Sequence, residues 1–519
     1  SNRGRAMPEA VGRHQEVVPN RAIITVCAMV ATLMQALDST IANVSLPYMQ
    51  GSLSASYDEI TWVLTSYIVA AAIMTAPVGW LAARFGSRAI YLVSVIGFTV
   101  FSMMCGIATS LDEMVLFRFM QGIFGAALVP LSQGTMLNIY SAEERGWAMS
   151  VWGMGVMLGP ILGPTLGGYL TELYNWRYVF FVNLPFGILC TLGLWFALPR
   201  QRPKRGLGFD WFGFSALAIG IAGLQLMLDR GETKDWFGST EIIIEAILAV
   251  GGFYAFLVHM VTGERTFVSP AIFKDRNLIM GFLVMFLVGM VLLASTALLA
   301  PWLQLLGNYP VDVAGLLLAP RGIGTMAAMM VAGRITDKMD SRWMMAFGVV
   351  LLSWSMIRLS EWTPAVNEWT LIYNTMIQGA GIGFIFVPLN VVAFATLPAQ
   401  LRYEATSFLT LVRSIGMSMG ISIFEALITQ NTQVEHSVLS VFASPLNRAL
   451  HAAPGIAHVL SPATRHGAVM LNQMITYQAQ VIAYNNDYWL MGIISIPIIA
   501  VLFFMRKPQH GGGGHAVMD

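Results

Sequence analysis

The chain carries little charge for its size. Only 11% of its 519 residues are Asp, Glu, Lys or Arg, against about 25% in soluble proteins. The 29 basic and 28 acidic residues leave a net charge of +1, so there is no basic excess to bind nucleic-acid phosphates. The chain is 56% hydrophobic, with a mean hydropathy of +0.66. This composition excludes a disordered protein and a nucleic-acid binder, and it indicates a protein embedded in lipid.

Cysteine is also scarce, and the motifs of common enzymes are missing. Cys27, Cys105 and Cys190 all fall in apolar runs, and an odd number of cysteines within lipid argues against a disulfide framework or a cysteine metal site. We interpret them as packing residues. The eight histidines are scattered, and the sequence has no Walker glycine loop, HExxH or GxSxG motif. Neither an enzyme nor a bound cofactor is expected.

Long apolar runs take up more than half of the chain. A membrane helix needs about 20 residues, and fourteen such segments can be marked in the sequence. The sequence therefore predicts an all-α integral membrane protein with 14 transmembrane helices. The segments are residues 22–46, 60–83, 89–109, 113–139, 145–172, 177–198, 211–229, 241–262, 277–300, 312–334, 342–360, 369–394, 403–429 and 487–506.

The distribution of Lys and Arg predicts the orientation. With the N-terminus inside, 20 of the 29 basic residues fall in inside segments, 6 in outside segments and 3 within spans. Cytoplasmic segments of membrane proteins carry such an excess. We expect a multi-pass protein with both termini in the cytoplasm, including the tails at residues 1–21 and 507–519.

The two halves of the sequence repeat each other. Gly79–Arg88 after the second span matches Gly333–Arg342 after the tenth at an offset of 254 residues. Gln121-Gly122 matches Gln378-Gly379 at an offset of 257, and the fifth and thirteenth spans match at the same offset. Spans 1–6 and 9–14 therefore form parallel six-helix repeats, with a substrate path between them. The predicted parts are bundles at 22–198 and 277–506, with a linker and inserted two-helix hairpin at 199–276.

Several motifs resemble the major facilitator superfamily over nearly the whole chain. They include Gly79–Arg88, Leu37–Pro47 in the first span, Arg118–Gly122 in the fourth, Gly155–Gly168 in the fifth, Trp176–Pro185 and Leu228–Gly231. In the first of these, Ala83 stands where the family usually has Asp, whereas the second copy has Asp337. The set is similar to fourteen-helix drug:proton antiporters of the EmrB type.

The resemblance implies a function and a location. It implies proton-coupled efflux of lipophilic compounds by alternating access, at the inner membrane of a Gram-negative bacterium. The implied partners are an EmrA-type periplasmic adaptor and a TolC-type outer-membrane channel, with the proton gradient in place of a cofactor. A proton-coupled importer on the same fold is the alternative, although the fifth-span motif is typical of exporters.

Asp38 and Arg118 are the leading candidates for proton coupling. A charged group within a span costs about 2.5–3.5 kcal/mol on insertion scales, so it needs a partner or a function. Gln35 shares the helical face of Asp38, and Gln121 shares that of Arg118. Burial disfavours the charged carboxyl, which allows Asp38 to gain and lose a proton. The structural alternatives are a permanent ion pair or a helix cap for Asp38, and a fold-stabilising salt bridge for Arg118.

Three further charged residues lie within spans. Arg321 and Arg413 fall near the midplane, which favours a cavity that accepts lipophilic weak acids, and Glu425 is a second candidate for protonation. Pairing with one another or with backbone carbonyls is the alternative for all three.

Conformational roles are expected for two motifs. In the fifth span, Gly159, Pro160, Gly163 and Pro164 predict either a hinge or close packing. In the loop motif, the expected residues are Gly79, Arg84, Gly86 and Arg88, with Asp337 in the second copy. The segment 431–486 is expected to be a long periplasmic loop that docks the adaptor.

Overall fold

A computed structural model describes residues 20–200, 204, 206–263, 266–336, 338–443 and 464–506, and these are helices with short connections. The first half contains α1 (Arg21–Ser52), α2 (Tyr57–Ile60), α3 (Trp62–Thr75), α4 (Val78–Phe85), α5 (Ser87–Ile107), α6 (Leu111–Gly125), α7 (Leu128–Ile139), α8 (Arg145–Leu173), α9 (Tyr178–Phe181) and α10 (Asn183–Ala197). The inserted hairpin is α11 (Trp211–Arg230) and α12 (Thr240–Thr262). The second half contains α13 (Arg276–Pro301), α14 (Val311–Ile335), α15 (Ser341–Leu359), α16 (Glu368–Val392), α17 (Arg402–Ser440), α19 (Arg465–Ser495) and α20 (Pro497–Phe503).

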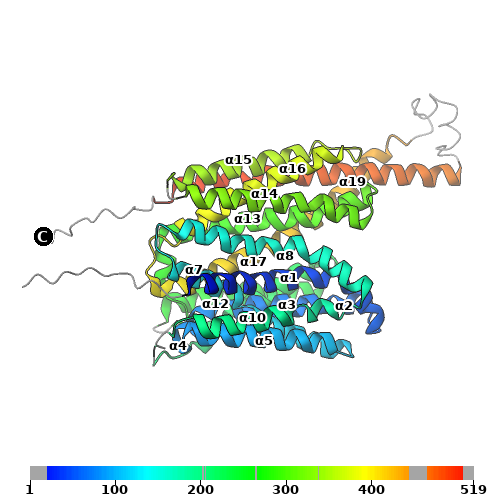
Figure 1. The fold of residues 1–519 in the computed structure, drawn as a ribbon. Helices are drawn as coiled ribbons and strands as arrows, with labels where there is room; N and C mark the ends of the chain where they lie inside the picture. The colour runs from blue at the N-terminus through cyan, green and yellow to red at the C-terminus, as the bar shows by residue number, and fades with distance from the viewer. Residues whose placement is uncertain are drawn as a thin grey trace, which may run out of the picture.

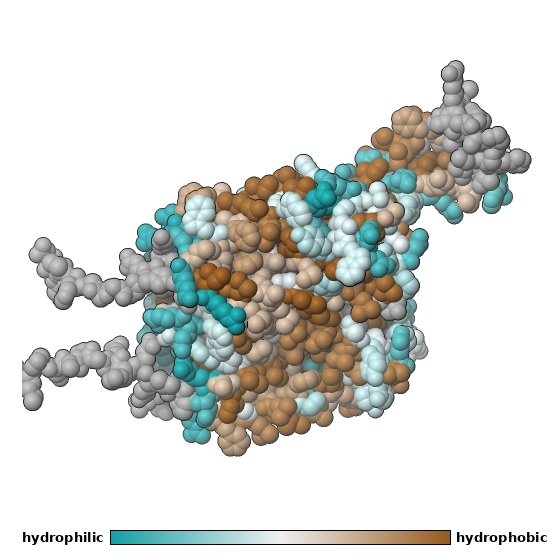
Figure 2. Space-filling model, turned by 45° about the horizontal axis from the view of Figure 1, so that its top comes forward, coloured by the Kyte–Doolittle hydropathy of each residue, from teal (hydrophilic) through white to brown (hydrophobic). Residues whose placement is uncertain are grey.

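Thirteen helices in the described part of the chain are long and apolar enough to cross a membrane. The count becomes fourteen when α3 and α4, which meet at an angle of 56° next to Pro77, are taken as one bent span. Helices suit lipid because each backbone N–H and C=O finds its partner within the helix. A broad apolar surface covers the middle of the molecule, and polar residues gather toward its ends (Figure 2). The predicted all-helical fold with 14 spans is confirmed.

The chain forms two helical bundles that lie against each other (Figure 1). In the first bundle, α1 packs against α8 and α10, and α6 packs against α3 and α5. In the second, α14 packs against α16, and α17 packs against α13 and α19. We call the face where α1 begins and α20 ends the terminal face. Arg21 at the start of α1 pairs there with Glu144, 2.8 Å away, which places the start of α8 on the same face.

The two bundles meet through polar contacts near the terminal face. Gln133 of α7 donates to Asn390 of α16 at 2.5 Å. Arg402 at the start of α17 donates to the carbonyl oxygen of Leu137 at 3.0 Å, and Thr406 donates to that of Pro130 at 3.0 Å. These bonds hold the halves together at this end of the molecule.

The inserted hairpin contacts both bundles at the end of α11. Thr65 of α3 donates a hydrogen bond to the Asp229 carboxylate. The carbonyl oxygen of the preceding residue, Leu228, accepts a hydrogen bond of 2.9 Å from Ser422 of α17. One turn of the hairpin is therefore attached to both halves.

The segment expected to be a loop at 431–486 is mostly helical where the structure describes it. The helix α17 continues to Ser440, and α19 begins at Arg465. In Figure 1 the start of α19 runs past the ends of the neighbouring helices, on the side away from the terminal face. The expectation of a loop is therefore corrected to a pair of projecting helices. Residues 444–463 lie outside the described residues.

Candidate functional site

Asp38 and Arg118 form a buried ion pair inside the first bundle. Asp38 lies on α1 and Arg118 on α6, and the distance from Arg118 Nη1 to Asp38 Oδ2 is 2.6 Å. The two side chains are 0% and 1% exposed. Both residues were candidates from the sequence, and the structure brings them together.

Polar side chains complete the surroundings of the pair. Gln121 donates to Asp38 Oδ1 at 2.9 Å, and its own oxygen accepts from Arg118 Nη1 at 2.9 Å. Asn183 at the start of α10 also donates to Asp38 Oδ1, at 3.5 Å. Arg118 Nε donates to the carbonyl oxygen of Val63 at 3.1 Å. Both charges therefore have partners, as a buried pair requires.

An aromatic ring covers the guanidinium. The centre of the Tyr67 ring lies 4.2 Å from Arg118 Cζ, close enough for a cation–π interaction. Neither Tyr67 nor Asn183 was among the predicted site residues. Asn183 belongs to the motif Trp176–Pro185, so the sequence contained a signal for it. No spacing in the sequence connects either residue to Asp38.

Two further polar residues of α1, Gln35 and Ser45, do not bond the pair in the described structure. Ser45 bonds Thr171 at 2.9 Å, and Gln35 is half-buried without a hydrogen bond to Asp38 or Arg118 among the described contacts. Of the three polar residues Gln35, Ser45 and Gln121, only Gln121 joins Asp38 and Arg118.

The glycines of α8 pack tightly against the part of α1 that carries Asp38. A Cβ on Gly159 would lie 2.4 Å from Ala36 Cβ, and one on Gly163 would lie 2.0 Å from Thr40 Oγ1. Thr40 also donates to the carbonyl oxygen of Gly159 at 3.3 Å. This geometry agrees with the close-packing interpretation, whereas a hinge stays a prediction. Pro160 is exposed and lies within α8, as does Pro164.

The first loop motif connects α4 to its surroundings on the terminal face. Gly79 lets α4 approach α17, because a Cβ there would lie 2.4 Å from Glu404 Cα. Gly86 has φ +91°, a conformation that glycine adopts without strain. Arg84 reaches the carbonyl oxygen of Lys204 at 3.5 Å, and Arg88 donates to that of Trp195. The predicted Asp337 in the second copy lies outside the described residues.

The charged residues of the second half have different surroundings. Arg321 is buried and donates to Thr296 and, at 2.9 Å, to the carbonyl oxygen of Leu292. Arg413 is half-buried on α17 and forms no ion pair with the described residues. Glu425 is exposed on α17, and none of its described contacts reaches Asp38.

Sequence reasoning missed a further buried carboxylate. Asp487 on α19 is 1% exposed, and neither of its oxygens has a hydrogen-bond partner among the described residues. The sequence placed Asp487 at the edge of the last span, where a carboxylate is expected to meet water. Because α19 begins at Arg465, the residue lies instead inside a long packed helix.

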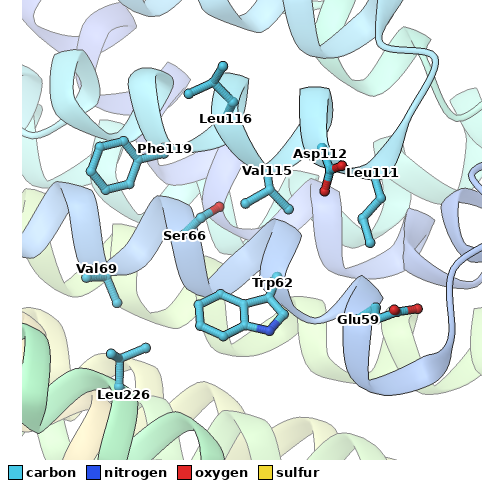
Figure 3. A pocket seen from close by; sticks show the side chains of 10 residues that line it. All are labelled: Glu59, Trp62, Ser66, Val69, Leu111, Asp112, Val115, Leu116, Phe119 and Leu226. Atoms are coloured by element: carbon cyan, nitrogen blue, oxygen red, sulfur yellow. The ribbon is translucent and has the colours of Figure 1, made fainter. Parts of the chain in front are cut away.

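A side cavity of about 580 Å³ lies between α3, α6 and the end of α11. Figure 3 shows apolar side chains from these helices around it, with Glu59 and Asp112 at one end. None of the predicted cavity residues lines it. The described part of the chain contains no group of His, Cys, Asp or Glu that fits a metal ion. Cys27, Cys105 and Cys190 are buried in the described structure, which agrees with their interpretation as packing residues.

Comparisons with known proteins place this architecture in a family. The sequence profile of the Major Facilitator Superfamily matches residues 28–421. The chain is 34% identical to the multidrug export protein EmrB of Escherichia coli K12 over 497 residues, which covers 95% of this chain and 96% of that protein. It is 31% identical to the fatty acid resistance protein FarB of Neisseria gonorrhoeae, with coverage of 95% and 98%.

Solved structures confirm the fold at low sequence identity. The proton:xylose symporter XylE superposes with a TM-score of 0.60 at 14% identity, covering 94% of this chain and 96% of XylE. The human organic anion transporter MFSD10 also gives a TM-score of 0.60 at 14% identity, with coverage of 92% and 100%. The chain therefore belongs to the Major Facilitator Superfamily, as an EmrB-type membrane transporter and not an enzyme.

Proposed function

We propose that this protein is a proton-coupled efflux pump for lipophilic compounds, with Asp38 as the proton carrier. The observation that carries the proposal is the buried Asp38–Arg118 pair, with Gln121 bonded to both residues. A proton on Asp38 removes one charge of the pair and leaves Arg118 without its counter-ion. The free energy of the buried site therefore depends on protonation, which is what coupling requires.

The packing around Asp38 offers a route from protonation to movement. Gly159 and Gly163 bring α8 against α1 on either side of Asp38, so a shift of α1 displaces α8. The helix α8 also packs against α14 of the second bundle. In this mechanism the contacts at the terminal face close one side of the substrate path, and proton exchange favours their opening.

Export of drug-like compounds is inferred from the relatives. The similar proteins include multidrug exporters, and the fifth-span glycine motif is typical of exporters. Buried or half-buried arginines in the second bundle favour weak acids among the substrates. The name of FarB, a fatty acid resistance protein, is consistent with that preference.

We also propose the bacterial inner membrane as the location, with the terminal face in the cytoplasm. The projecting ends of α17 and α19 then stand in the periplasm. Val434 and Val438 lie on one face of α17, Val441 follows directly after its last residue at helical spacing, and the three are 51%, 50% and 73% exposed. An apolar stripe outside the membrane is a suitable contact for a helical periplasmic adaptor of the EmrA type, which would connect the pump to a TolC-type outer-membrane channel.

Transport in proteoliposomes tests the coupling. With a proton gradient imposed, wild-type protein should accumulate a radiolabelled lipophilic aryl carboxylate, and Asp38→Asn should reduce gradient-driven transport to the level of empty liposomes. Exchange of labelled substrate without a gradient should persist in Asp38→Asn, which distinguishes lost coupling from lost folding.

Two outcomes would contradict this proposal. Full gradient-driven transport by Asp38→Asn would remove the proton role of Asp38. Uptake instead of extrusion, measured in intact cells that express the protein, would favour the importer.

A further inference from the structure

The proton-coupling site has a counterpart in the second half of the chain. In the first half, Gln121 donates to Asp38 at 2.9 Å across a separation of 83 residues. In the second half, Gln378 donates to Ser295, also at 2.9 Å and across 83 residues. Gln378 and Ser295 each lie 257 residues after their counterparts, which is the offset of the repeat. The two hydrogen bonds therefore occupy equivalent places in the two bundles.

Each of these places also contains one guanidinium, but on different helices. In the first half it is Arg118 of α6, whose equivalent in the second half is Thr375. In the second half it is Arg321 of α14, which lies 254 residues after Tyr67, at the offset of the loop motif. Arg321 Nη2 lies 3.2 Å from Ser295 Oγ, so it reaches the residue equivalent to Asp38.

The equivalent sites differ in net charge. Asp38 balances Arg118 in the first half, whereas Ser295 stands in the place of Asp38 and leaves Arg321 without a carboxylate. Arg321 is 7% exposed and forms no ion pair with any described residue. Its hydrogen bonds go to two hydroxyl groups and one carbonyl oxygen, which carry no full negative charge. A buried cation in these surroundings favours an anion beside it.

A buried hydroxyl group without a partner in the described part of the chain interacts electrostatically with this cation. Tyr488 of α19 is 1% exposed, and its phenol oxygen has no hydrogen-bond partner among the described residues. Tyr488 also lies within electrostatic range of Arg321. A carboxylate that accepts from both side chains would balance the charge of Arg321 and satisfy the buried hydroxyl.

We propose that the carboxylate of a lipophilic weak acid binds at Arg321, where the first half has the carboxylate of Asp38. This inference rests on the proposed efflux function and assigns its anionic substrates to a site. The repeat then divides two tasks between equivalent places. The first half has its own carboxylate, which carries the proton, and the second half takes its carboxylate from the substrate.

Equilibrium binding to purified full-length protein tests the site, with 2-naphthoate as the anionic probe and 2-naphthamide as its neutral analogue. A charge-assisted hydrogen bond is worth about 10- to 100-fold in affinity, so Arg321→Gln should weaken naphthoate binding by about that factor. Naphthamide binding should change less than about 3-fold. Arg321→Lys should recover part of the loss, and the exposed control Arg358→Gln should bind naphthoate as the wild type does.

A second variant keeps the test decisive if Arg321→Gln does not fold. Ser295→Asp supplies the missing carboxylate from the protein itself, with Arg321 and Gln378 in place to bond it. This variant should fold and lose naphthoate binding by at least about 10-fold, because its own carboxylate occupies the site. Wild-type affinity for naphthoate in Ser295→Asp, or in folded Arg321→Gln, would overturn the proposal.

The binding test at Arg321 and the transport test of efflux can fail independently of each other. Loss of naphthoate binding in the two variants supports the site even when the wild type shows no proton-driven transport, because binding is measured without a gradient. In the converse case, the wild type shows proton-driven efflux and both variants bind naphthoate as the wild type does. That result would support the efflux proposal and contradict the binding of a carboxylate at Arg321.

Discussion

Gln133 and Asn390 are separated by 257 residues, the offset of the internal repeat, and they bond each other at 2.5 Å. Residues related by a two-fold axis meet only where that axis passes close to both. The hydrogen bond therefore marks the axis that relates the two bundles. It lies among the contacts that join the halves near the terminal face, so its loss affects how firmly that end is closed.

Gln133→Leu should favour opening at the terminal face. The substitution leaves the Asn390 side-chain oxygen buried without a donor, which costs about 1–3 kcal/mol in the closed conformation only. The ratio of open to closed molecules should rise by about 5- to 150-fold. Distances between spin labels at the terminal-face ends of α8 and α17 measure this ratio. Thr363→Ala, at an exposed position on the opposite face, is the control, and an unchanged distance distribution in Gln133→Leu would contradict the expectation.

The stability losses from removing Asp38 and from removing Arg118 should not be additive, because each residue is the partner of the other. Asp38→Asn or Arg118→Gln alone leaves an unbalanced buried group and should lower the free energy of unfolding by about 3–5 kcal/mol. The double variant should lose less than the sum of the two losses, by about 1–3 kcal/mol. Denaturant unfolding in detergent measures these differences. The exposed pair Arg358–Glu361 provides a control cycle that should be additive within about 0.5 kcal/mol.

Two glycines of α8 provide a matched test of close packing. Gly163→Ala places a methyl group against Thr40 and should separate α8 from α1, whereas Gly168 has open space around its Cβ position. We expect Gly163→Ala to reduce transport by at least about 10-fold, because in enzymes a displacement of about 1 Å can lower the rate by about 100-fold. Gly168→Ala should transport normally. Equal activity of the two variants would show that the contact between α1 and α8 does not limit transport.

The apolar stripe on α17 should bind the adaptor without taking part in transport. Val438→Asp places a charge in the middle of the stripe and should weaken adaptor binding by at least about 10-fold, because the carboxylate loses water at the contact. Transport by the variant in proteoliposomes should match that of the wild type. Ser440→Asp adds the same charge at a nearby exposed position of α17 that does not share the face of the stripe. If it weakens adaptor binding equally, net charge is responsible and the stripe is not.

The sequence predicts those parts of the fold that depend on apolar length. The spans, the repeat and the inserted hairpin follow from runs of about 20 apolar residues and from matched motifs. The projecting parts of α17 and α19 were missed for the same reason. Residues outside lipid need not be apolar to form helix, so hydropathy does not detect where a helix continues beyond the membrane.

The sequence predicts the two charged residues of the candidate site but not the residues that surround them. Asp38 and Arg118 stand out because ionisable residues are rare in spans. Asn183 and Tyr67 are ordinary residues for a helix in lipid, and only the packing of α10 and α3 brings them to the pair. The contrast between Asp38 and Ser295 likewise emerges from superposing two hydrogen bonds, since serine in a span is unremarkable on its own.

The end of α11, joined to Thr65 on one side and Ser422 on the other, has a consequence for the evolution and engineering of this chain. Excising α11 and α12 to make a twelve-helix protein would remove one hydrogen-bond acceptor from a hydroxyl group in each bundle. In the proposed alternating-access mechanism, a movement between the bundles would have to break one of these two contacts or bend the end of α11.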